Sequence, residues 1–141
     1  MATKADFTED EWKTMHKGVT GAGMLVSSSD PGLTDSFSEA SALAKQLVEE
    51  RTTGSTQLVR ELASEGGTGF GFMSSREKVE GETLDALRSS IALLAAKAPD
   101  EQDPYRQLVL EVAEHVAEAK GGVSSPESDA IAKIKEALGA T

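Results

Sequence analysis

Three carboxylates surround one short loop of the sequence, and their chemistry is that of a hard-cation site. Asp30, Asp35 and Glu39 lie in and just after the run Ser27 to Gly32. Carboxylate oxygens on a short loop suit Ca²⁺ or Mg²⁺, although the spacing is not that of an EF-hand. The same acids also favour a helix N-terminus through its dipole, and this is the commoner reason for acids in a first turn. A divalent metal at these residues is the only cofactor that the sequence suggests.

A second group, of apolar side chains, lies in a glycine-rich segment from Glu65 to Ser74. Phe70, Phe72 and Met73 stand among four glycines there. Apolar groups on a loop indicate a contact surface for a protein partner. They equally suit a loop anchored on the helix that follows, because apolar loop residues usually find cover. The glycine spacing is not that of a dinucleotide-binding loop, and no phosphate-binding lysine follows.

The remaining residue types give no catalytic signature. The chain has no cysteine and only two histidines, His16 and His115, whereas zinc normally takes three or four nitrogen or sulfur ligands. The two rings approach one another only if their helices pack together. Serines are plentiful, but no Gly-x-Ser-x-Gly occurs. We therefore expect a protein that is not an enzyme.

Composition narrows the partners further. The 141 residues carry a net charge of −10, and phosphate backbones repel such a surface, so nucleic acid is not an expected partner. The longest apolar stretch, Ile91 to Ala98, is too short to span a bilayer and contains Lys97. Acids occupy the first ten residues, where a signal peptide needs an apolar core. The sequence thus predicts a cytoplasmic protein that does not insert into a membrane.

The segments that must position these residues have apolar residues at helical spacing along most of their length. We predict a helical hairpin over 8–51, a short helix and the glycine-rich loop over 55–74, a central helix over 75–98, and a second hairpin over 104–138. Thr8 and Glu11 have the spacing of a capping box, which predicts the start of the first helix. Alternating strand patterns are nearly absent.

Apolar residues at steps of three and four predict the core-facing side of each helix. In the first helix they are Trp12, Met15, Val19, Ala22 and Val26; in the short helix, Leu58 and Leu62; in the fifth, Tyr105, Leu108 or Val109, Val112 and Val116; in the last, Ile131, Ile134 and Leu138. The helix over 75–98 carries two overlapping stripes, and a helix apolar over so wide an arc is usually central.

The two ends of the chain look like copies of one unit. A shift of 90 residues lays Met15, Val19, Ala22 and Val26 on Tyr105, Val109, Val112 and Val116. The same shift aligns a loop of glycine, apolar residue and hydroxyl residue in both copies, a pattern that terminates one helix and caps the next. The predicted fold is therefore all-α: one compact domain of about six helices, with two hairpins related by a pseudo-two-fold repeat around the central helix.

The repeat resembles the TerB-like, tellurite-resistance-associated helical domains. The similar stretches are Gly23 to Val48 and Glu111 to Gly139, and the second contains the run Gly-Val-Ser-Ser-Pro-Glu at 122–127. The family's loop usually carries Asp-Gly, where this chain has Pro31-Gly32 and Gly121-Gly122. The resemblance implies an all-helical fold, a cytosolic, stress-associated and non-enzymatic role, and divalent-metal binding through acidic residues. We expect a binding or scaffold domain that contacts a protein partner or a second copy through an apolar helix face, with metal binding as the alternative.

Overall fold

The computed structural model describes residues 3–28, 56–64, 76–118 and 125–139, and each of its elements is helical. They are η1 (Lys4–Asp6), α1 (Glu9–Ser28), α3 (Gln57–Ser64), α4 (Arg76–Lys97), η2 (Pro99–Glu101), α5 (Gln102–Glu118) and α6 (Ser125–Ala137). The predicted all-α class is confirmed for these residues, none of which lies in a strand. Within the same ranges, no helix is both long enough and apolar enough to cross a membrane.

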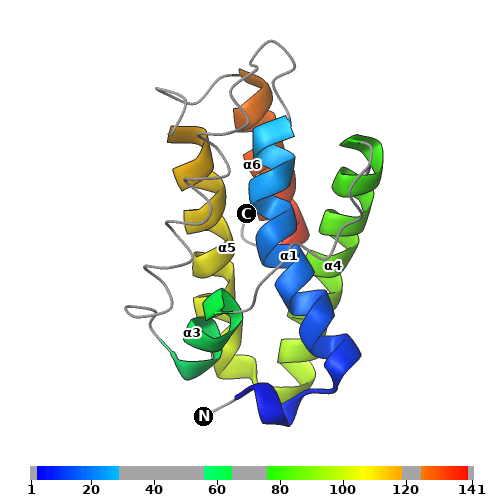
Figure 1. The fold of residues 1–141 in the computed structure, drawn as a ribbon, viewed down its shortest axis with the longest axis vertical. Coiled ribbons are helices and arrows are strands. Elements are labelled where there is room, and N and C mark those ends of the chain that lie inside the picture. The colour runs from blue at the N-terminus through cyan, green and yellow to red at the C-terminus, as the bar shows by residue number, and fades with distance from the viewer. Residues whose placement is uncertain (1–2, 29–55, 65–75, 119–124, 140–141) are drawn as a thin grey trace.

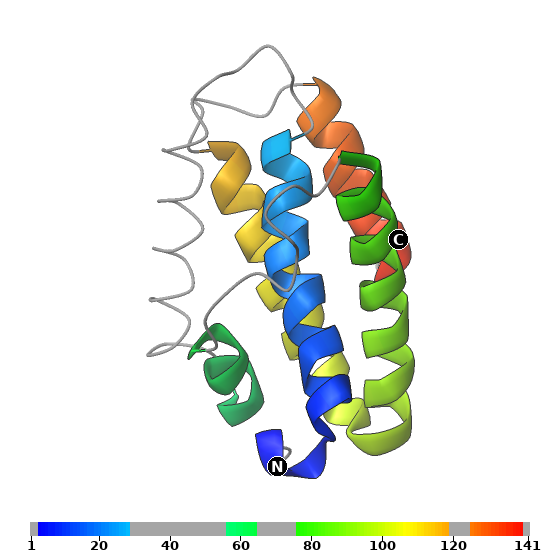
Figure 2. The ribbon, with the colours of Figure 1, turned by 45° about the vertical axis from the view of Figure 1, so that its right-hand side comes forward.

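The four long helices form a bundle of alternating direction. In Figure 1, α1 and α5 run upward, whereas α4 and α6 run downward. The turned view in Figure 2 shows the same directions, with α3 low beside the N-terminal half of α1. Helix α1 contacts α3, α4, α5 and α6, so the other described helices are arranged around it.

The centre of the bundle is therefore α1 and not α4, which corrects the predicted central helix over 75–98. From Gly18 to Val26 every side of α1 is buried, with only Met24 partly exposed. The outward side of α4, in contrast, is open to solvent along the length of the helix. Glycine explains the difference, because Gly18 and Gly21 let neighbouring helices approach the α1 backbone. A Cβ atom at position 18 would lie 2.5 Å from Tyr105 Oη and 3.0 Å from Leu87 Cδ2.

The start of α1 follows its sequence signal. The Thr8 backbone N–H donates to Glu11 Oε1 at 2.8 Å, and the Glu11 N–H donates to Thr8 Oγ1 at 3.1 Å. These two bonds form the predicted capping box and satisfy donors that the first turn leaves free. The predicted stripe of α1 is confirmed as well, since all five of its residues are buried.

One hydrophobic core joins the described helices. Helix α3 contributes Leu58 and Leu62, as predicted, and α6 contributes Ile131, Ile134 and Leu138. On α4, each of the two predicted stripes contains residues that are buried and residues that are only partly buried. Its buried residues are Val79, Thr83, Ala86, Leu87, Ser90 and Leu94, whereas Leu84, Ile91 and Leu93 are only partly buried.

Helices α5 and α6 cover most of the range of the second predicted hairpin, 104–138, and the residues that join them, 119–124, lie outside the described residues. Helix α5 begins at Gln102 because the 3-10 turn Pro99–Glu101 runs directly into it. Pro104 then stands at the third helical position, where the backbone N–H has no partner within the helix and its loss is harmless. Of the first predicted hairpin, 8–51, the part over 29–51 lies outside the described residues. The pseudo-two-fold repeat therefore stays a prediction.

Candidate functional site

The two groups singled out in the sequence lie outside the described residues. These are the acids Asp30, Asp35 and Glu39 and the apolar residues Phe70, Phe72 and Met73. Both remain predictions without a structural account. Across the described ranges, no three histidine, aspartate or glutamate side chains come together as a metal site would require.

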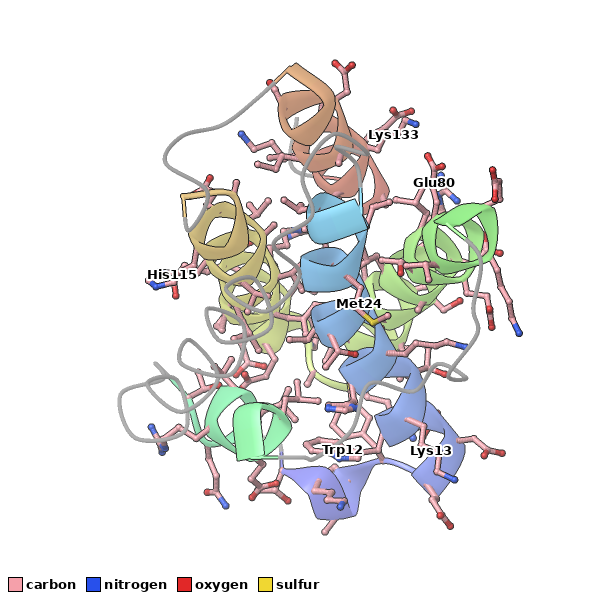
Figure 3. The ribbon with its side chains drawn as sticks, turned by 45° about the horizontal axis from the view of Figure 1, so that its top comes forward. Trp12, Lys13, Met24, Glu80, His115 and Lys133 are labelled. Atoms are coloured by element: carbon pink, nitrogen blue, oxygen red, sulfur yellow. The ribbon has the colours of Figure 1, made fainter. Side chains whose placement is uncertain are left out.

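The two histidines do not share a site. His16 is buried on α1, and His115 is partly exposed on the outer side of α5, where it points away from α1 (Figure 3). The hydrogen bond from Tyr105 Oη to the Met15 carbonyl sets these two helices in register. Since α1 and α5 run in the same direction, His115 lies nine residues beyond the level of His16. At a rise of 1.5 Å per residue this is about 13 Å along the helix axis.

Tyr105 is the largest fully buried side chain, and its hydroxyl lies where α1, α4 and α5 meet. It donates to the Met15 carbonyl at 2.8 Å. Burial raises the pKa of Tyr105 well above its ordinary value, and the neighbouring Ser90 hydroxyl opposes the shift only in part. The phenol therefore stays neutral and acts as a structural donor. Because it is inaccessible to solvent, it contacts other helices and not a substrate.

A second buried polar pair joins α3 to the start of α5. Thr56 Oγ1 accepts the Val59 N–H at 3.2 Å and so caps α3. The same hydroxyl donates to Glu101 Oε2 at 2.8 Å, and Glu101 is only 1% exposed. This carboxylate therefore holds the start of α3 in place.

At the lower end of the bundle, cationic and aromatic side chains close the core. Lys97 Nζ donates to Glu11 Oε1 at 2.6 Å and lies 5.5 Å from the centroid of the Phe7 ring. The hydrogen bond from Lys97 holds the pKa of Glu11 below its usual value, with the Thr8 N–H adding to the effect. Lys4 lies 5.5 Å from the centroid of Trp12. These contacts tie the N-terminal residues to the ends of α1 and α4.

A third surface of interest is the outward side of α4, which is exposed to solvent. We name it the α4 outer face and define it by its exposed residues Gly81, Asp85, Arg88, Ala92, Ala95 and Ala96. The side chains of Asp85 and Arg88 are 80% and 57% exposed, and the ion pair that joins them within the helix is long, at 3.4 Å. From Ala86 to Ala98 the chain contains no acid.

The α4 outer face belongs to a firmly held helix. On its inner side, Thr83 packs against Gly21 so closely that no Cβ atom fits there. Lys17 Nζ bonds Glu82 Oε1 at 2.6 Å, and this bond holds the pKa of Glu82 below its usual value. Lys133 on α6 bonds Glu80 at 2.5 Å, and Figure 3 shows these two side chains pointing toward one another.

Sequence reasoning did not single out this face. Its signal is a spacing of four, three and four residues between Gly81, Asp85, Arg88 and Ala92. That spacing keeps all four residues on one side of a helix. Hydrophobic periodicity does not detect such a set, because two members are charged and two are small.

Comparison of this chain with protein-family models, with curated proteins and with solved structures finds no match. The resemblance to the TerB-like domains therefore remains a hypothesis that depends on the residues quoted above.

Proposed function

We propose that this chain is a non-enzymatic helical binding domain, TerB-like in architecture, that acts through protein contact at the α4 outer face. The observation that carries the proposal is the character of this face. It presents three exposed alanines and one exposed glycine beside the opposite charges of Asp85 and Arg88, and it has no packing partner among the described helices.

Small side chains make this face suitable for another helix. Two helices come closest where their contact residues are small, because the interaxial distance depends on the side chains between them. Half-buried Leu84 and Ile91 lie along one edge and add larger apolar surface. A helix laid over the alanines would cover these two residues as well.

Rigidity favours the same role. Contacts to α1 and α6 hold α4 in place, so binding does not have to order the surface first. A preorganised surface loses less conformational entropy on association than a loose one does.

Alanine is also the strongest helix former, so exposure by itself does not separate a contact surface from an ordinary helix surface. The experiment must therefore probe contact directly.

A photo-crosslinking amino acid at position 92, in the full chain and in its own cells, tests the proposal. We expect covalent adducts with a defined protein, which includes a second copy of this chain. The matched control places the same amino acid at position 107, an exposed glutamine on α5. Absence of adducts from position 92, or the same adducts from both positions, contradicts the proposal.

A further inference from the structure

We propose that the occupant of the α4 outer face is a second copy of this chain, which binds as an antiparallel, two-fold pair of α4 helices. This inference rests on the proposed function and names the partner of the same surface. It follows from the order of charges and small residues along α4: when the helix is read from its other end, small residues recur at the same places and the acid and the base exchange places.

The order is small, acid, base, small. Gly81, Asp85, Arg88 and Ala92 are separated by four, three and four residues, and at about 100° per residue all four lie within about 60° of one another. A two-fold axis between Ala86 and Leu87 places Asp85 of one copy opposite Arg88 of the other. It also places Gly81 opposite Ala92. Each of these contacts occurs twice, as a two-fold interface requires.

Charge is compatible with a two-fold contact at this face. Two copies of charge −10 repel one another in most orientations. At the α4 outer face the two charges are opposite and pair reciprocally. Their 3.4 Å contact within the helix is loose, and both side chains are largely in solvent, so they are free to turn toward a partner.

Space at the ends of the contact favours a close approach. A Cβ atom on Gly81 would meet no atom of the described residues within 4 Å, and Gly81 is exposed. Ala92, opposite it in the pair, presents only a methyl group. Helices separated by residues of this size pack at interaxial distances near the short end of about 8–10 Å. The half-buried Leu84 and Ile91 then lose solvent contact along the edge.

Charge reversal distinguishes this pair from other modes of association. We expect sedimentation equilibrium of the purified chain to show a monomer–dimer equilibrium. Arg88→Asp makes both facing positions acidic and Asp85→Arg makes both basic, so each variant should dimerise at least about tenfold more weakly because like charges then face one another. An equimolar mixture of the two variants should form a heterodimer, and the double variant D85R/R88D should recover the homodimer.

Lys13→Asp is the matched control, since it changes charge by the same amount at a side chain that is 70% exposed near the start of α1 (Figure 3). It should leave dimerisation unchanged, and circular dichroism should show all variants folded. A wild-type chain that stays monomeric at every concentration overturns the inference. So does a dimer that is indifferent to Arg88→Asp, or a mixture that does not associate. If position 92 crosslinks a different protein while the purified chain stays monomeric, the proposed function survives and this inference fails.

Discussion

The same substitution, glycine to alanine, should have opposite effects at two helical positions of this protein. Gly81 lies inside α4 on the solvent side, and a Cβ atom there would have no neighbour within 4 Å in the described part of the chain. Glycine in a helix interior is less favourable than alanine by about 0.8–1.0 kcal/mol. Gly81→Ala should therefore stabilise the fold by nearly this amount, at concentrations where the chain is monomeric.

Gly21 lies inside α1 and gains the same helix propensity from alanine, but its Cβ atom would overlap Thr83. The new atom would lie inside van der Waals contact of Thr83 Oγ1 and 3.0 Å from Thr83 Cγ2. Thr83 is fully buried on α4 and has little room to move. Overpacking of this kind costs about 1–3 kcal/mol. Because the overlap involves two atoms, we expect the upper part of that range and a net destabilisation of about 1–2 kcal/mol.

Thermal unfolding followed by circular dichroism measures both effects. A change of 1 kcal/mol corresponds to roughly 3–5 °C in Tm for a chain of this length. The variant T83A removes the obstructing atoms, so the pair G21A/T83A should be less destabilised than the two single variants added together. Equal stabilisation by Gly21→Ala and Gly81→Ala would refute the close α1–α4 contact. Strict additivity of the pair would refute the assignment of the overlap to Thr83.

Three further predictions concern titration and metal binding. Burial raises the pKa of Tyr105, the one tyrosine, so the fold should lose stability as pH rises above 10. Tyrosinate absorbance should then appear only as helical dichroism is lost. Ionisation of Tyr105 while the helical dichroism is intact contradicts this prediction. Because Lys97 lowers the pKa of Glu11, their pairing stabilises the fold above pH 4.5 and is lost as pH falls through the lowered pKa. Lys97→Met should therefore lower Tm at neutral pH but much less in acid, and an equal loss at both would contradict the pairing. For the metal hypothesis, calorimetric titration with Ca²⁺, Mg²⁺ or Mn²⁺ should give heat that Asp30→Ala and Asp35→Ala abolish, and no heat at millimolar ion contradicts it.

Predictions from the sequence agree with the structure where they depend only on residues within a single helix. The Thr8–Glu11 box depends on four consecutive residues, so a nearby donor and acceptor suffice to predict it. The buried positions of α1 and α3 follow from apolar residues on one side of each helix. The start of α5 does not, because the turn Pro99–Glu101 joins it without a break, and a proline gives no sign of what precedes it.

The candidate site was less accessible to sequence reasoning. The acids around residues 30–39 and the apolar residues at 70–73 attracted attention because their types suggest chemistry, but the structure does not describe them. The α4 outer face combines residues that attract no attention singly. Asp85 and Arg88 look like a solvated pair, and Gly81 and Ala92 look neutral. Their meaning depends on which side of α4 faces solvent, and packing decides that.

Small residues account for the error over the central helix. Hydrophobic periodicity treats glycine as neutral and alanine as apolar, so it ranked α4 above α1. In the structure, the glycines of α1 are buried because they admit the neighbouring helices, and Gly18 is closed in by Tyr105 and Leu87. The alanines near the end of α4 are exposed. Buried glycine and exposed alanine are therefore two results of one arrangement. Because α1 takes the centre, α4 lies at the edge of the bundle, and its outer face is exposed to solvent.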